Sequence, residues 1–128
     1  MNFLAHTSLS GDSDAILVGN FIADSVKGNA RDKYKHNSGI LEGIILHRKI
    51  DRFTDQHMMV KKSIMRLRHH YGRYASVLVD IFYDHFLAKN WNLYHKVSLE
   101  HHAQHVYEAL ESFKSQLPSN AQPNLPPI

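Results

Sequence analysis

The stretch SGILEGIILHRKIDRFT, residues 38–54, shows the pattern that decides the fold class of this 128-residue chain. Its apolar residues recur at spacings of three and four, which is typical of an amphipathic helix with one face in a core. These residues are Ile40, Leu41, Ile44, Ile45 and Ile50. Ser38 is a suitable N-cap, so the stretch predicts a helix that runs to about Thr54.

Four more helices are predicted around this one. Asp12 or Ser13 can cap a first helix, Gly28 and Gly72 are typical residues at helix ends, and Ser98 can cap the last helix. The predicted helices cover residues 13–27, 38–54, 58–71, 74–89 and 98–117, with a polar loop at 29–37. No segment alternates as a strand would. We therefore predict an all-α fold, a compact helical bundle of about five helices.

Length and composition limit the organisation of the chain. A chain of this size is about one domain, which we expect to cover residues 1–117, followed by a Pro-rich tail at residues 118–128. No apolar run approaches the roughly 20 residues that span a bilayer. The N-terminus also lacks the features of a signal peptide. We expect a cytoplasmic protein that does not enter membranes.

The absence of cysteine excludes disulfides and thiolate metal sites, so any metal must be held by nitrogen and oxygen. The sequence has no Gly-rich phosphate loop and no Gly-x-Ser-x-Gly elbow. Basic residues interleaved with Tyr34, Tyr71 and Tyr74 form no recognisable nucleic-acid module, so no nucleic-acid partner is expected.

The charge is distributed unevenly, although the net charge is only +3. Twelve of the fifteen Lys and Arg residues lie between Lys27 and Arg73, against four acidic residues. This stretch is either a solvated helical face or a docking surface for an anionic partner.

Two acids and a histidine lie within the apolar stretch VLVDIFYDHFL, residues 77–87. Asp80 and Asp84 are one helical turn apart and share a face, with His85 at its edge. Ionised carboxylates among apolar groups cost several kcal/mol unless a cation, a partner charge or hydrogen bonds offset them. The alternative to a metal is that either acid pairs with a buried arginine, such as Arg52 or Arg73.

His47 and Asp51 form a second pair at one-turn spacing, in similarly apolar company. The two helices look like the two halves of a site for a divalent cation, and imidazole favours Mn²⁺, Fe²⁺ or Zn²⁺ among such ions. In the alternative interpretation, His47 is solvated beside a surface pair of Asp51 and Arg48.

Three further positions have two interpretations each. Asp24 falls near the end of the first predicted helix, where the helix dipole disfavours an anion, so it either pairs with Lys27 or serves the site. His6 follows an apolar run and is either a core histidine or a ligand. His101, His102 and His105 have polar neighbours and are expected at the surface.

Four blocks of the sequence resemble the acyl carrier protein phosphodiesterases, which are divergent relatives of the HD phosphohydrolases. The blocks are MNFLAH (1–6), GNFIAD (19–24), LHRKIDRFTD (46–55) and DIFYDHFLA (80–88). The resemblance implies an HD-like enzyme that depends on Mn²⁺ or Mg²⁺. Such an enzyme removes 4'-phosphopantetheine from the serine of holo-acyl carrier protein and leaves the apo carrier.

With this resemblance, a mechanism and a set of roles can be expected. The cation activates water for attack on the phosphodiester. The expected metal ligands are His47, Asp51, Asp84 and His85, with His6 and Asp24 as candidates for the remaining positions. Asp80 or Asp24 orients or deprotonates the water. Arg48 or Arg52 neutralises charge on the phosphoryl oxygens.

The resemblance also implies a partner, since acyl carrier proteins are strongly acidic. Lys61, Lys62, Arg66 and Arg68 are the expected contacts with it. Members of the family continue with further helices beyond the position of Ile128, so uncovered apolar surface could favour a homo-oligomer. Two alternatives stay open, namely an HD-type nucleotide phosphohydrolase and a non-catalytic, shortened helical module.

Overall fold

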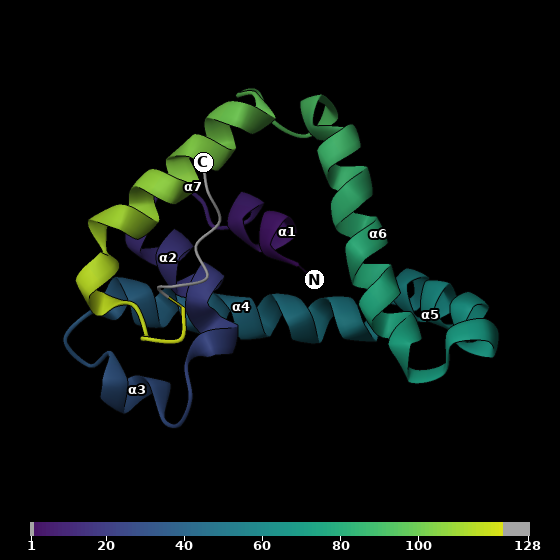
Figure 1. The fold of residues 1–128 in the computed structure, drawn as a ribbon, viewed down its shortest axis with the longest axis horizontal. Helices are drawn as coiled ribbons and strands as arrows, with labels where there is room; N and C mark the ends of the chain where they lie inside the picture. Colours follow the sequence, from purple (N-terminus) through teal and green to yellow (C-terminus); the bar gives the residue numbers. More distant parts are fainter. Residues whose placement is uncertain (1, 122–128) are drawn as a thin grey trace.

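The computed structural model describes residues 2–121, and within this range every regular element is a helix (Figure 1). The all-α prediction is therefore confirmed. The α-helices are α1 (Phe3–Ser8), α2 (Asp14–Ile22), α3 (Ala30–Lys33), α4 (Ser38–Gln56), α5 (Met58–Tyr71), α6 (Ala75–Lys89) and α7 (Leu99–Ser112). Short 3-10 helices lie at Ala23–Ser25, Gly72–Tyr74, Trp91–Leu93 and Lys114–Gln116. None of the described helices combines the length and the apolar character needed to cross a membrane.

Local signals account for most helix ends. The side chains of Ser13 and Ser98 accept the N–H groups of Ile16 and His101, as expected of N-caps. Gly72, at φ 55°, terminates α5. Asn37, rather than the predicted Ser38, caps α4.

Several segments differ from the prediction. Helix α1 was not predicted, and α7 ends at Ser112 rather than near residue 117. The first predicted helix ends as an α-helix at Ile22 and continues only as the 3-10 helix Ala23–Ser25. The predicted loop 29–37 contains α3, whose N-cap Asn29 accepts two backbone N–H groups. Most of the predicted tail, residues 122–128, lies outside the described residues, so the domain boundary stays a prediction.

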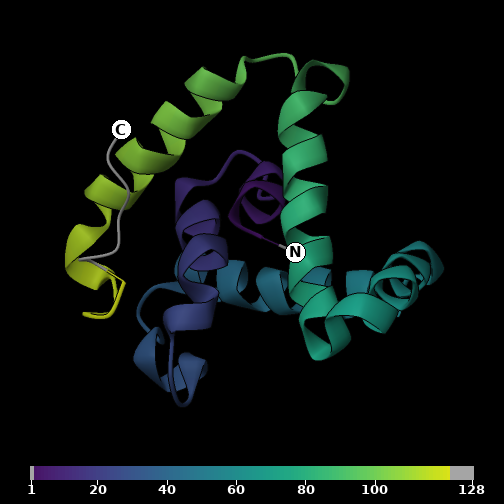
Figure 2. The same ribbon diagram turned by 45° about the vertical axis from the view of Figure 1, so that its right-hand side comes forward.

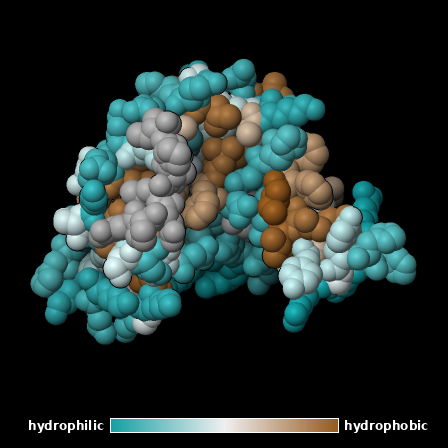
Figure 3. All heavy atoms as spheres, viewed as in Figure 1, coloured by the Kyte–Doolittle hydropathy of each residue, from teal (hydrophilic) through white to brown (hydrophobic). Residues whose placement is uncertain are grey.

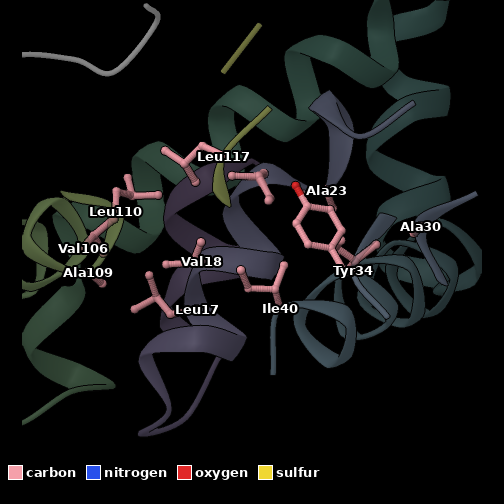
Figure 4. Close-up of a cluster of buried hydrophobic side chains, with 12 residues drawn as sticks. Leu17, Val18, Ala23, Ala30, Tyr34, Ile40, Val106, Ala109, Leu110 and Leu117 are labelled. Atoms are coloured by element: carbon pink, nitrogen blue, oxygen red, sulfur yellow. The ribbon is translucent and has the colours of Figure 1, made fainter. Parts of the chain in front are cut away.

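The core lies where α2, α4 and α7 meet (Figure 4). Val18, Ile40, Ile44 and Leu110 are fully buried there. Tyr34 closes one side of this core and donates its hydroxyl to the carbonyl of Gln116 at 3.0 Å. Burial of these apolar side chains fixes α2 and α4 as the platform on which the site is built.

Gly19 of α2 and Gly43 of α4 allow these two helices to cross at very short distance. A Cβ on Gly43 would lie 2.1 Å from the carbonyl oxygen of Ile16 and 2.7 Å from the nitrogen of Asn20. A Cβ on Gly19 would lie 2.1 Å from the carbonyl oxygen of Ile40. Any side chain at these positions would push the helices apart, so the glycines set the helix separation.

Helices α5 and α6 pack side by side at the far end of α4, and α1 lies between α2 and α6 (Figures 1 and 2). A hydrogen bond of 2.7 Å joins Ser63 of α5 to the hydroxyl of Tyr83 on α6. Figure 3 shows hydrophobic side chains gathered over α6. Val77, Ile81 and Phe86 on this helix are 53%, 47% and 53% exposed. The apolar side chains that neighbour Asp80 and Asp84 in the sequence are therefore not buried on all sides of α6.

Candidate metal centre

His47 is buried on the inner face of α4, and hydrogen bonds fix both of its ring nitrogens. Its Nδ1 lies 2.9 Å from the carbonyl oxygen of Asn20. Because a carbonyl can only accept, Nδ1 carries a proton. Its Nε2 faces two carboxylates at 3.2 Å, Oδ1 of Asp24 and Oδ2 of Asp51. His47 and Asp51 thus share a face, as their spacing predicted.

His6 reaches the same carboxylate from α1. Its Nε2 lies 3.0 Å from Oδ1 of Asp51, and its ring stacks on that of His47 with centroids 3.7 Å apart and planes at 11°. Burial is the main cause that lowers the pKa of His6, because it disfavours the charged imidazolium, and the neighbouring His47 acts in the same direction. The Nδ1 atom of His6 is buried and has no hydrogen-bond partner.

These groups form a cluster with the chemistry of a metal site. His6, His47 and Asp51 each offer a ligand atom, and these atoms lie within 4.8 Å of one another. Within residues 2–121 this is the one group of three potential ligands that comes so close together. Two imidazole nitrogens and a carboxylate suit Mn²⁺, Fe²⁺ or Zn²⁺. A ligating histidine normally donates its second N–H to a carbonyl or a carboxylate, as His47 does to Asn20. The residues present therefore fit a divalent cation.

Asp24 lies at the open side of this cluster. It belongs to the 3-10 helix that follows α2, and its side chain is 78% exposed. The Asp24–His47 contact explains why an anion stands at the unfavourable end of α2.

Asp84 has a structural partner in α1. Its two oxygens accept the N–H groups of Leu4 and Ala5, each at 3.1 Å, and so satisfy donors at the start of that helix. Burial raises the pKa of Asp84, while these two hydrogen bonds and the nearby His6 act in the opposite direction. Asp84 lies beside the cluster without being one of its converging ligands.

The other predicted ligands and catalytic residues are more distant or more exposed. His85 is exposed and has its ring against Phe86. Asp80 is half-buried on α6 and is not part of the cluster. Arg48 and Arg52 are exposed on α4, each next in sequence to a cluster residue. Ligand roles for Asp84 and His85 stay predictions, as do the roles given to Asp80 and the two arginines.

The predicted partner contacts lie on α5. Lys61, Lys62, Arg66 and Arg68 are all exposed, so this helix presents a basic surface.

The histidines of α7 differ among themselves. His101 and His105 are exposed, as predicted, and His105 pairs with Asp14 at 2.7 Å. His102 is half-buried, because its Nε2 lies 3.0 Å from Oγ1 of Thr7 and its ring packs 4.8 Å from that of Trp91. Burial lowers the pKa of His102.

Sequence reasoning missed Asn20, which touches both histidines of the cluster. Its side chain is fully buried, and its Nδ2 donates to the carbonyl of His6 at 2.9 Å and to Oγ of Ser10 at 3.0 Å. The sequence did contain a signal for this residue. Asn20 lies in an apolar helix, where a buried amide side chain needs hydrogen-bond partners.

An apolar cavity of about 560 Å³ lies between α1, α2 and α7. Its walls include Phe3, Thr7, Phe21, Ser25 and Tyr107. Thr7 follows His6 and Ser25 follows Asp24, so the cavity and the cluster share the same two segments of the chain.

Comparison with known proteins agrees with the resemblance noted in the sequence. The profile of the family described as acyl carrier protein phosphodiesterase matches residues 1–128. A protein of that name from Photorhabdus laumondii is 37% identical over 123 residues, covering 89% of this chain and 61% of the relative. Others from Yersinia enterocolitica and Salmonella agona are 40% and 42% identical over 92 and 91 residues, covering 72% and 71% of this chain.

The chain spans 61%, 47% and 46% of the length of these three relatives. No solved structure shows significant similarity to it. The match over its whole length shows that the chain belongs to the acyl carrier protein phosphodiesterase family.

Proposed function

We propose that this chain carries a divalent-metal centre that hydrolyses the phosphodiester between 4'-phosphopantetheine and the serine of holo-acyl carrier protein, giving the apo carrier. The single observation that carries this proposal is the convergence of His6, His47 and Asp51 within 4.8 Å. Membership of the phosphodiesterase family supports the choice of reaction.

The proposed ligands are His6, His47 and Asp51, with Asp24 as the carboxylate nearest to them on the exposed side. Two imidazoles make Mn²⁺, Fe²⁺ or Zn²⁺ a better match than Mg²⁺, which prefers oxygen ligands. Mn²⁺ is our first choice among them. When bound, such a cation lowers the pKa of water and stabilises negative charge on a phosphoryl oxygen.

The chain's own residues would supply the remaining functions. Asp24 is an exposed carboxylate that already contacts His47, so we assign to it the acceptance of a proton from the attacking water. We choose Asp24 over Asp80 because Asp24 contacts His47 directly, at 3.2 Å. Arg48 and Arg52 are the guanidinium groups next in sequence to His47 and Asp51, and we assign to them the neutralisation of phosphoryl charge.

The apolar cavity is the proposed subsite for the prosthetic arm. The arm carries methyl and methylene groups close to its phosphate, and walls such as Phe21 and Tyr107 would exclude water from them. The hydroxyl groups of Thr7 and Ser25 provide hydrogen bonds at the same walls. The carrier protein itself would dock against the basic surface of α5.

The test is a comparison of substrates with purified protein freed of metal. With Mn²⁺ added, we expect release of phosphopantetheine from holo-acyl carrier protein and no hydrolysis of a panel of nucleotides. Hydrolysis of nucleotides alone would support the HD-type nucleotide phosphohydrolase instead. If neither substrate reacts and Mn²⁺ does not raise the melting temperature, the non-catalytic alternative is supported.

A further inference from the structure

His102 of α7 lies in the wall of the apolar cavity, and its ring is held from two sides. Its Nε2 lies 3.0 Å from Oγ1 of Thr7, a buried residue of α1. The ring also packs against the indole of Trp91, with centroids 4.8 Å apart. Trp91 is buried and donates its Nε1 proton to the carbonyl of Val97 at 2.9 Å. The imidazole therefore has a fixed orientation in the wall.

The contact with Thr7 decides which ring nitrogen of His102 carries the proton. The hydroxyl of Thr7 has one proton, which it donates to the carbonyl of Leu4 at 3.1 Å. Because Oγ1 can then only accept from the imidazole, the proton of neutral His102 is on Nε2 and Nδ1 is an acceptor. Burial, followed by the nearby His95 and His105, lowers the pKa of His102, which favours this neutral form at pH 7.

The acceptor at Nδ1 is available to a ligand. Within residues 2–121 it has no hydrogen-bond partner, and it is not one of the two buried atoms that lack one, so it is accessible. Because the side chain lines the cavity, Nδ1 is the acceptor that His102 can offer to a ligand there.

The rest of the wall limits the kind of ligand that can use this acceptor. Apolar side chains such as Phe3, Phe21 and Val106 surround the cavity. A charged ligand would lose its hydration among them, whereas an uncharged N–H group loses less and regains a hydrogen bond at Nδ1. The prosthetic arm proposed for this cavity carries two amide groups on a chain that is otherwise largely apolar. An amide N–H therefore matches the acceptor of His102.

We infer that His102 is a specificity-determining residue of the cavity, which accepts a hydrogen bond at Nδ1 from an amide N–H of the prosthetic arm. The ligand class of the cavity is thus an uncharged chain that carries amides, and a hydrocarbon chain of similar size is a poorer match. This inference rests on the proposed function because it takes the arm as the ligand, but it needs no metal ion.

The first test changes one group of the ligand at a time. Free pantetheine is the probe, and two analogues each replace one of its amide N–H groups by an ester oxygen. Titration of metal-free protein, followed by NMR, measures their binding. We expect the natural protein to bind one of the two esters about tenfold more weakly than pantetheine, because that ester gives His102 no proton to accept.

Two variants assign this preference to the side chain. His102→Leu keeps a similar volume but removes the acceptor, so we expect it to bind pantetheine and both esters equally. His101→Gln is the matched control at the exposed neighbouring position, and it should keep the preference of the natural protein.

The second test needs no variant, so it remains decisive if His102→Leu does not fold. Nitrogen chemical shifts of an imidazole report which ring nitrogen carries the proton and whether the other accepts a hydrogen bond. We expect the proton of His102 on Nε2 with and without pantetheine, and we expect the Nδ1 signal to shift when pantetheine is added. The signals of the exposed His101 are the internal reference and should not move.

The outcomes separate this inference from the proposed function. If pantetheine binds but both esters bind equally well, or if the Nδ1 signal of His102 does not move, the role of His102 is refuted and the cavity remains the subsite for the arm. If millimolar pantetheine does not bind, the inference and the subsite both fail. The metal centre is still tested in that case by uptake of Mn²⁺ and by release of phosphopantetheine from the holo carrier.

Discussion

At the scale of single residues, the site depends on how two carboxylates and two imidazoles meet. The one-turn spacing of His47 and Asp51 was visible in the sequence, and the structure places both on one face of α4. A ligand role for His6 was only one of its two interpretations. The sequence does not show that His6 contacts Asp51, which lies 45 residues further along the chain. Pairings of this kind depend on tertiary packing.

The surroundings of Asp80 and Asp84 are less buried than their apolar neighbours in sequence suggested. Apolar neighbours in sequence suggested burial, but Val77, Ile81 and Phe86 are about half-exposed. Only the side of α6 that faces α1 gives Asp84 a protected position, and two backbone N–H groups meet it there. The apolar composition of a helix therefore does not by itself show how far its acids are buried.

The first prediction concerns Asp51, which contacts both histidines. Asp51→Asn keeps the shape but removes the charge and one acceptor, so we expect affinity for Mn²⁺ to fall by at least about 100-fold, or about 2.7 kcal/mol. Calorimetric titration measures it. Asp55→Asn is the control, an exposed acid one turn further along α4 that should bind Mn²⁺ like the natural protein. Equal affinity in both variants would contradict the assignment of Asp51.

The second prediction concerns pH and His102. Burial lowers the pKa of His102 in the folded protein, so the unfolded chain binds more protons below about pH 6.5. The stability from keeping His102 neutral is therefore complete above that pH and is lost as the pH falls. The pKa of His6 is lowered too and acts in the same direction.

Thermal melts of metal-free protein at pH 7.5 and pH 5.5 measure this effect. We expect the melting temperature of His102→Gln to fall less between pH 7.5 and pH 5.5 than that of the natural protein. The exposed neighbour gives a control, since His101→Gln should behave like the natural protein. An equal loss in His102→Gln would show that burial of His102 does not affect stability.

At the scale of helices, local signals predicted α5 at the bounds observed and the N-caps of α2 and α7. Helix α1 was not predicted, because six residues are too few to show periodicity. Its start is held by Asp84, about 80 residues away. The short distance between α2 and α4 could not be predicted from the sequence either. A glycine inside a helix indicates lower helix stability, and only the three-dimensional structure shows that it allows another helix to approach closely.

The third prediction tests that close approach. Gly43→Ala places a Cβ where backbone atoms of α2 already lie, so we expect a loss of about 2–3 kcal/mol in the free energy of unfolding. It should also weaken binding of Mn²⁺, because the carbonyl of Asn20 moves away from His47. Urea unfolding measures the first effect. The adjacent exposed substitution Glu42→Ala should change stability by less than about 0.5 kcal/mol.

The fourth prediction separates the two roles considered for Asp84. If Asp84 holds α1, Asp84→Ala should lower the free energy of unfolding of metal-free protein by about 1–2 kcal/mol, since two N–H groups lose their acceptor. Its affinity for Mn²⁺ should fall much less than that of Asp51→Asn. His85→Ala, at the exposed neighbour, should affect neither quantity. A loss of affinity as large as that of Asp51→Asn, with unchanged stability, would make Asp84 a ligand.

At the scale of the whole molecule, the candidate centre and the basic surface belong to different parts of the fold. The centre is formed by α1, α2 and α4, whereas Lys61, Lys62 and Arg66 lie on α5 at the far end of α4 (Figure 1). The uneven charge of the sequence predicted such a surface. A carrier protein that reaches both would have its body on α5 and its prosthetic arm directed toward α1.

The fifth prediction tests this separation of docking from chemistry. Reversal of Lys61 and Lys62 to Glu should raise KM for holo-acyl carrier protein with little change in kcat, and the effect should weaken as salt is added. Steady-state kinetics at low and high ionic strength measure it. Reversal of Lys89 and Lys96, which are exposed but lie off α5, gives the same change in net charge. An equal rise in KM there would assign the effect to net charge rather than to α5.

The most direct test of the account is the position of Mn²⁺ in a crystal of this protein, located by anomalous diffraction. We predict one peak within about 2.0–2.3 Å of Nε2 of His6, Nε2 of His47 and a carboxylate oxygen of Asp51. A peak held by Asp80, Asp84 and His85 without these histidines, or no peak at saturating Mn²⁺, would contradict it.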